Sequence, residues 1–143
     1  MDHFKAINDA YGHPVGDLVL KKIARILCRG ARKGDVIGRL GGEEFGIFLV
    51  GASIFETYRS AERLRELISR ADFELPIALR VTCSFGIAAG EKGEGWEQAY
   101  NRADKALYHA KAEGRDNVAQ PSDLKRPICQ WERLPRLLKG NNR

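Results

Sequence analysis

The sequence contains no long apolar run. None of its hydrophobic stretches approaches the roughly 18 consecutive apolar residues of a membrane-spanning helix, and its first residues lack the apolar core of a signal peptide. We therefore expect a cytoplasmic protein without a membrane span. Its 143 residues, 43% hydrophobic and 30% charged, have the composition of a single globular domain.

Cysteine is scarce. The three cysteines are Cys28, Cys83 and Cys129, an odd number at wide separation with no Cys-x-x-Cys pair. This pattern does not favour a zinc site. Cys28 and Cys83 fall on apolar faces of predicted elements, so we expect reduced residues that pack in the core.

Excess charge is concentrated near the C-terminus. The net charge is +5, and residues 119–143 hold six Lys/Arg against two Asp/Glu. The remaining chain is nearly balanced, and we expect no nucleic-acid partner. Prolines in residues 119–143 predict a flexible, basic tail. As an alternative, four apolar residues there could form a short helix that docks on the domain or on a membrane surface: Trp131, Leu134, Leu137 and Leu138.

Two adjacent glycines and two adjacent carboxylates occur within the octapeptide Arg39–Gly46. The apolar segments Val36–Leu40 and Phe45–Val50 flank this motif, so the Gly-Gly step predicts the reversal of a β-hairpin whose second strand is mostly buried. The carboxylates then lie at the hairpin tip. Neighbouring carboxylates suit Mg²⁺ with bound phosphates, although a solvated hairpin with acidic neighbours has the same pattern.

Hydrophobic periodicity predicts four helices. The first covers Phe4–Tyr11 and is broken at Gly12-His13-Pro14, and Asp17 lies near the first turn of the second. Ser53 and Glu56 form a capping box before the third, and the fourth runs from Trp96 to Glu113 with Gly114 as its C-cap. The second and third helices have these buried stripes: Leu20, Ile23, Ala24 and Leu27; Ile54, Tyr58, Ala61, Leu64 and Ile68.

Strict alternation from Ile77 to Ile87 predicts a long central strand. One face of this strand is polar or small. We expect the other face to lie in the core, and it comprises Ile77, Leu79, Val81, Cys83, Phe85 and Ile87.

The pentapeptide Gly41-Gly42-Glu43-Glu44-Phe45 resembles the signature of the GGDEF family, the diguanylate cyclases. Several other segments resemble that family in the same order, and the resemblance covers residues 2 to about 118, so we assign 1–118 to the domain. These segments are Asp2–Asp9, Tyr11–His13, Gly16–Asp17, Arg32–Asp35, Ser84–Ala88, Ala103–Lys111 and Gly114–Arg115.

The resemblance implies an α/β (α+β) sandwich with a largely antiparallel sheet flanked by helices, similar to the ferredoxin-like palm of nucleotidyl cyclases. In the family a buried strand ending in Asp-x-Asp precedes this segment, and its first acid is a metal ligand. Asp2 matches the second acid and Met1 the intervening residue. We therefore expect the family's first helix and first strand to be missing, and with them some stability and activity.

The activity implied by the resemblance is condensation of two GTP into cyclic di-GMP and two pyrophosphates by a homodimer, with Mg²⁺ or Mn²⁺. Glu43 would be the catalytic, metal-binding carboxylate and Glu44 a second metal ligand. The Met1 carbonyl would also bind metal, and Lys5 would act near the phosphates. As an alternative, the chain is an impaired fragment that only binds cyclic di-GMP.

Further residues acquire roles from the same resemblance. Asn8 and Asp17 would read guanine, because an amide and a carboxylate match its donors and acceptors, and this favours GTP over ATP. The helix dipole alone would also favour an acid at Asp17 and cations near the end of the fourth helix. The remaining substrate-binding residues are His13, Gly41, Gly42, Lys111 and Arg115.

An inhibitory product site is implied by Arg32-x-x-Asp35, with Arg63 as a further arginine. A guanidinium fork and a carboxylate suit the phosphates and guanines of cyclic di-GMP. A solvated loop has the same composition.

Overall fold

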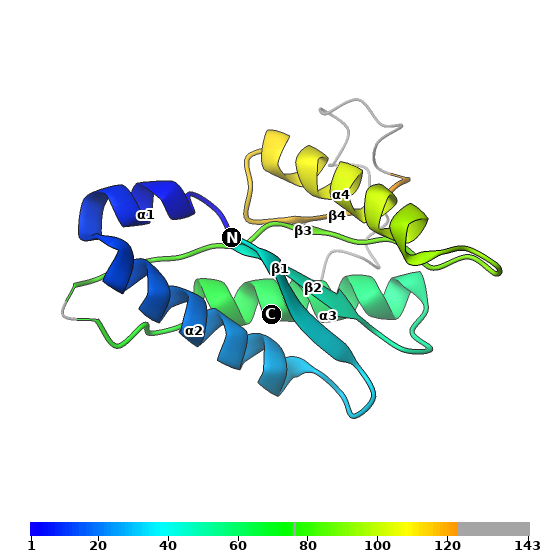
Figure 1. Ribbon diagram of the computed structural model, residues 1–143, viewed down its shortest axis with the longest axis horizontal. Coiled ribbons are helices and arrows are strands. Elements are labelled where there is room, and N and C mark those ends of the chain that lie inside the picture. Colours follow the sequence, from blue (N-terminus) through cyan, green and yellow to red (C-terminus); the bar gives the residue numbers. More distant parts are fainter. Residues whose placement is uncertain (76, 123–143) are drawn as a thin grey trace, which may run out of the picture.

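The computed structural model describes residues 1–75 and 77–122. In chain order these form α1 (Phe4–Tyr11), α2 (His13–Gly30), β1 (Val36–Gly41), β2 (Glu44–Phe48), α3 (Ile54–Ser69), β3 (Phe85–Gly86), α4 (Trp96–Ala112) and β4 (Val118–Ala119). The strands lie between α4 on one side and α2 and α3 on the other (Figure 1). The α+β class predicted from the sequence is confirmed.

The four predicted helices are present. α3 begins with the predicted capping box, in which Ser53 Oγ accepts from Glu56 N–H at 3.2 Å and Glu56 Oε2 accepts from Ser53 N–H at 2.8 Å. Gly114 follows the end of α4 with a φ of 108°, the left-handed conformation typical of a residue after a helix C-cap. α2 begins at His13, directly after Gly12, so Asp17 lies just after its first turn, near the position that the sequence predicted.

The main core joins α1, α2, α3 and the extended segment that precedes β3. Apolar side chains that recur every three or four residues place one face of each helix there. Ala24, Ile54 and Tyr58 are only half-buried, at the margins of the predicted stripes. The buried members are Ile7, Val19, Ile23, Leu27, Leu64, Ile68, Phe73, Val81 and Cys83.

The predicted long strand from Ile77 to Ile87 is wrong in extent. Of residues 77–87, all of which the structure describes, only Phe85 and Gly86 form a strand, which pairs in parallel with β4. The predicted alternation holds in part. Val81, Cys83 and Ile87 are buried, but Ile77, Leu79 and Phe85 of the same face are only half-buried, and Ser84 on the other face is buried. Alternation determines which side chains face the core, whereas a ladder also requires a neighbouring backbone.

The described strands form two separate sheets in place of one largely antiparallel sheet. β1 and β2 pair antiparallel, and β3 and β4 pair parallel. A cavity of about 140 Å³ lies between Phe45 and Ile47 of β2 and residues 83–87. β2 is accordingly half-buried, with Phe48 exposed, and not mostly buried as predicted.

The predicted burial of Cys28 is also wrong. Cys28 lies on the exposed side of α2, whereas Cys83 is buried, and both are free thiols. Burial raises the pKa of the Cys83 thiol to about 11. Cys129 and nearly all of the predicted tail, residues 123–143, lie outside the described residues.

Candidate active site

The hairpin tip is built by Gly41, Gly42 and the strands on either side. Gly42 has a φ of 48°, which favours glycine, and open space surrounds the position that a side chain would occupy at either glycine. Arg39 fixes the turn, since its Nε and Nη2 donate to Gly42 O at 2.9 and 2.6 Å. The backbone at the tip is therefore held by Arg39 and open to a ligand.

Glu43 follows the turn and is half-buried. Its backbone carbonyl accepts a hydrogen bond from the Met1 amino group at 3.3 Å. The next residue, Asp2, donates its backbone N–H to Thr82 O at 3.0 Å. The first two residues thus connect the hairpin tip to the segment that leads into β3.

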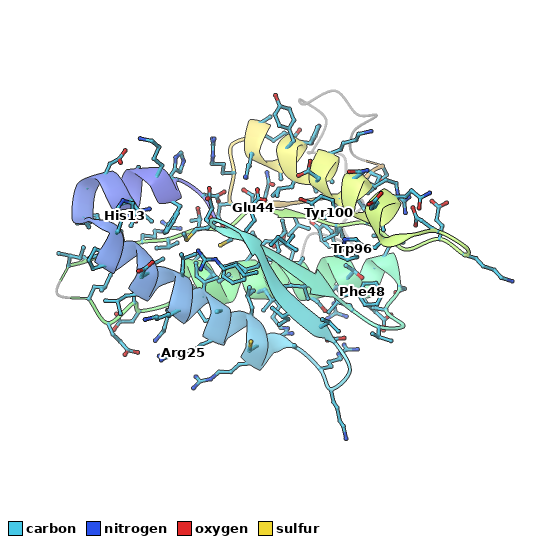
Figure 2. All side chains as sticks on the ribbon, viewed as in Figure 1. His13, Arg25, Glu44, Phe48, Trp96 and Tyr100 are labelled. Atoms are coloured by element: carbon cyan, nitrogen blue, oxygen red, sulfur yellow. The ribbon has the colours of Figure 1, made fainter. Side chains whose placement is uncertain are left out.

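Glu44 faces the last turn of α4. Lys111 Nζ lies 4.0 Å from Glu44 Oε1, and both side chains are partly exposed. Figure 2 shows Glu44 beside α4. The structure therefore brings together Glu44 and a cation that the sequence separates by more than sixty positions.

Asn8 lies at the junction of α1 and α2, against Gly16, the residue before Asp17. Asn8 Oδ1 is buried without a hydrogen-bond partner in the described structure, and it packs against Gly16, where a Cβ atom would lie 2.0 Å from it. Asp17 is exposed and lines a groove of about 480 Å³ between α2 and β1. His13 lies exposed at the same junction (Figure 2). The Asn8 amide oxygen is thus enclosed at the helix junction, against Gly16.

Among the described residues, Lys5 makes no contact with the hairpin carboxylates Glu43 and Glu44. Its Nζ bonds Asp9 Oδ2 at 2.8 Å, one turn along α1, and its side chain is 89% exposed. The hydrogen bond and the negative charge of Asp9 raise the pKa of Lys5. Lys5 is thus a solvated cation whose predicted role near phosphates is not tested by these contacts.

Arg32, Asp35 and Arg63 cluster where α2 ends. Asp35 Oδ2 accepts from Arg32 N–H at 2.8 Å, and Asp35 N–H donates to Arg32 O at 3.1 Å, which closes the loop and leaves the Arg32 guanidinium exposed. Arg63 Nη2 donates to Gly30 O at 2.8 Å. The three predicted residues of the product site therefore share one surface.

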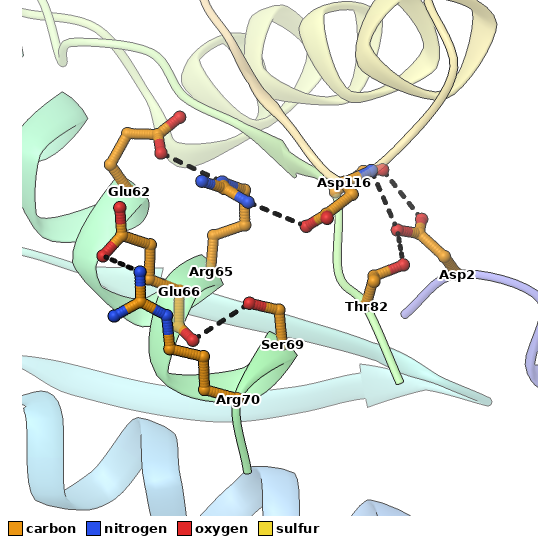
Figure 3. A network of polar contacts seen from close by, with 9 residues as sticks. Asp2, Glu62, Arg65, Glu66, Ser69, Arg70, Thr82 and Asp116 are labelled. Atoms are coloured by element: carbon orange, nitrogen blue, oxygen red, sulfur yellow. Dashed lines mark hydrogen bonds and ion pairs between the residues drawn. The ribbon is translucent and has the colours of Figure 1, made fainter. Parts of the chain in front are cut away.

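Sequence reasoning gave no role to a buried network on the other side of the hairpin. Asp2, 3% exposed, accepts hydrogen bonds from Thr82 Oγ1, Ser84 Oγ and Asp116 N–H at 2.9, 2.7 and 3.1 Å. Arg65 binds Asp116 Oδ1 at 2.9 Å (Figure 3). One feature of the sequence could have indicated part of this network: Asp116 directly follows Gly114-Arg115. Asp tolerates left-handed backbone better than most residues, so this tripeptide favours a tight turn after the helix.

The donor set available for a metal ion is small. The described residues contain no group of three or more His, Cys, Asp or Glu side chains that could hold a metal. Two adjacent carboxylates remain, Glu43 and Glu44, with the Met1 carbonyl as a further candidate. This set fits Mg²⁺, which is usually bound by one or two carboxylates together with substrate phosphates and water.

Comparison with known proteins decides the family. Residues 1–117 match the family described as "Diguanylate cyclase, GGDEF domain". The chain belongs to the GGDEF family. This GGDEF domain is 46% identical over 119 residues to diguanylate cyclase DgcP of Pseudomonas aeruginosa, a match covering 82% of this chain and 18% of DgcP. It is 40% identical over 122 residues to the probable diguanylate cyclase DgcT of Escherichia coli, with coverages of 82% and 27%.

A solved GGDEF domain has the same fold. The GGDEF domain of DgcB from Caulobacter crescentus, crystallised in complex with c-di-GMP, superimposes with a TM-score of 0.80 at 31% identity, over 85% of this chain and 73% of that one. This GGDEF domain spans about a fifth to a quarter of the length of DgcP and DgcT. Among its described residues, no helix combines the length and apolar character needed to cross a membrane.

Proposed function

We propose that this GGDEF domain condenses two GTP molecules into cyclic di-GMP with release of two pyrophosphates. The observation that carries this proposal is the approach of Lys111 to Glu44 at the glycine-rich hairpin tip, 4.0 Å between Nζ and Oε1. A cation beside a carboxylate pair, next to open backbone, is suited to a nucleotide triphosphate with its metal ion. Family membership supports the same reaction.

Each residue then has a distinct task. Asn8 and Asp17 bind the guanine base, with His13 beside them, and Lys111 and Arg115 hold triphosphate oxygens close to Gly41 and Gly42. Glu43, Glu44 and the Met1 carbonyl are the candidate ligands of Mg²⁺ or Mn²⁺. Such an ion, when bound, lowers the pKa of the attacking 3′-hydroxyl and neutralises charge at the α-phosphate. Lys5 approaches the phosphates from α1.

The reaction requires two copies of the domain. Each copy binds one GTP, and the 3′-hydroxyl of one nucleotide must lie in line with the α-phosphate of the other. A homodimer with the two hairpins face to face meets this requirement. The same reasoning, with GTP as substrate, gives a cytoplasmic location for the reaction.

Arg32, Asp35 and Arg63 form the product site in this proposal. Their common position at the end of α2, with the Arg32 guanidinium free of the loop's own hydrogen bonds, supports bidentate binding of a guanine or phosphate. A domain that has lost turnover but keeps this site would be a cyclic di-GMP receptor. That is the second candidate function.

The test is a turnover assay with a receptor assay beside it. We expect the chain with GTP and Mg²⁺ to form cyclic di-GMP and pyrophosphate, measured by chromatography, and Glu43→Gln to abolish formation without lowering the melting temperature, because a half-exposed carboxylate contributes little to stability. Full turnover by Glu43→Gln would refute the assignment. No turnover by the unsubstituted chain, together with calorimetric binding of cyclic di-GMP, would favour the receptor.

A further inference from the structure

The loop after α4 contains three consecutive residues in the left-handed conformation. Gly114, Arg115 and Asp116 have φ angles of 108°, 66° and 46°. Glycine adopts this conformation freely and Asp tolerates it better than most residues, whereas Arg adopts it only when the surroundings hold it. The strained turn includes Arg115, the candidate triphosphate ligand. The contacts that hold the turn therefore also determine the position from which the Arg115 side chain extends.

Three contacts hold this turn. Arg115 N–H donates to Ala110 O at 3.1 Å, which anchors the turn to α4. Asp116 N–H donates to Asp2 Oδ2 at 3.1 Å, and Asp116 Oδ1 accepts from Arg65 Nη1 at 2.9 Å. Asp2 therefore holds Asp116 through its backbone, and Arg65 holds it through its side chain (Figure 3). We call this pair of contacts the grip on Asp116.

Both residues that grip Asp116 are themselves fixed. The Asp2 carboxylate is buried and also accepts hydrogen bonds from two hydroxyl groups before β3. Arg65 is mostly buried and shares its guanidinium with Glu62 Oε2 at 2.9 Å. Burial works against the charge of Arg65, but its bonds to Asp116 and Glu62 raise its pKa. A charged, pre-ordered fork on α3 thus faces the turn.

We propose that Asp2 and Arg65 are positioning residues, which hold Asp116 in its left-handed conformation and thereby aim Arg115 at the triphosphate. This inference rests on the proposed function, because it takes Arg115 as a triphosphate ligand. Without the grip, Asp116 returns to ordinary backbone conformations and Arg115 must be ordered anew each time GTP binds. Ordering one long side chain at a binding site weakens affinity by about 2- to 10-fold.

The test is a double-mutant cycle between Arg65→Met and Arg115→Met, measured well below the melting temperature. We expect Arg65→Met to raise KM for GTP by about 2- to 10-fold and to change kcat little. Arg115→Met should raise KM at least as much, and the double variant no further, because Arg65 acts only through Arg115. A loss caused by general destabilisation would instead add to that of Arg115→Met.

Matched variants separate the grip from simple packing. Asp116→Asn keeps an acceptor and a residue tolerant of left-handed backbone, so we expect near-normal KM, whereas Asp116→Ala should behave like Arg65→Met. Arg70→Met is the control, because Arg70 is the C-cap residue of the same helix and pairs with the exposed Glu66 at 3.8 Å (Figure 3). It should leave KM unchanged.

Three outcomes would overturn the inference. Additive losses in the cycle would show that Arg65 acts independently of Arg115. A KM for Asp116→Ala equal to that of the unsubstituted chain would show that the turn needs no grip. Absence of calorimetric GTP binding by the unsubstituted chain would refute the proposed function itself, and this inference with it, whereas normal binding combined with an additive cycle would refute the inference alone.

Discussion

Lys111 Nζ lies 4.0 Å from Glu44 Oε1, so the last turn of α4 is joined to the tip of the β1–β2 hairpin. Both side chains remain partly exposed, and exposed ion pairs contribute only about 0–1 kcal/mol to stability. The pair therefore has little value for the fold. Its place at the hairpin tip, next to Glu43, supports the proposed binding of a triphosphate with its metal ion.

For this reason we expect Lys111→Met to raise KM for GTP while the melting temperature hardly changes. A charge-assisted hydrogen bond to a phosphate contributes about 1.5–3 kcal/mol, which corresponds to roughly 10- to 150-fold in KM. Steady-state kinetics and a thermal melt measure the two effects. Lys105→Met, an exposed lysine on the same helix, is the control. Equal KM values for the two variants would contradict the assignment of Lys111.

The proposed product site leads to a binding prediction. Removal of the exposed guanidinium in Arg32→Ala should weaken cyclic di-GMP binding by roughly 10- to 150-fold, because a bidentate, charge-assisted contact is lost. Isothermal calorimetry measures the dissociation constant. The neighbouring Lys33→Ala changes the same net charge outside the Arg-x-x-Asp pattern and should bind nearly normally. If Arg32→Ala binds as tightly as Lys33→Ala, the loop is only a solvated connection.

The cap of α3 leads to a prediction about pH. Hydrogen bonds from the backbone and side chain of Ser53 lower the pKa of Glu56 from 4.5. A carboxylate with a depressed folded pKa stabilises the protein above the unfolded value, and this contribution is lost as pH falls through the folded pKa. We therefore expect the unsubstituted chain to melt higher than Glu56→Gln at pH 7, and the difference to disappear below the folded pKa. A difference independent of pH would show that the charge of Glu56 is not involved.

The contact of β3 with α4 leads to a prediction about packing. A Cβ atom at Gly86 would lie 2.1 Å from Ala103 O and 2.3 Å from Leu107 N, which are backbone atoms that cannot move aside separately. Gly86→Ala should therefore lower the free energy of unfolding by about 1–3 kcal/mol or more. Gly90→Ala meets open space and is the matched control. Denaturant melts of the two variants should differ clearly, and equal stability would show that α4 packs elsewhere.

Local order in this domain was predictable from the sequence. The bounds of α1, the capping box of α3 and the hairpin around Gly41-Gly42 follow from side-chain periodicity, caps and turn residues, which act within a few positions of the chain. The motifs also identified the family, because several of them recur in a fixed order. The burial of Val81, Cys83 and Ile87 was predicted by alternation alone.

Features that depend on contacts between distant segments of the chain were decided only by the tertiary structure. Alternation could not say that the strand from Ile77 would pair only at Phe85 and Gly86, because pairing depends on which backbone comes alongside. An apolar stripe also does not predict the burial of residues at its margin, because this depends on how far the neighbouring element extends. Cys28, at such a margin, is exposed. Most of all, sequence gave Asp2, Arg65 and Asp116 no common role. These residues come together only when the N-terminal segment, α3 and the loop after α4 meet. Because the contacts are largely removed from water, each of the three polar side chains then depends on the others for its hydrogen bonds.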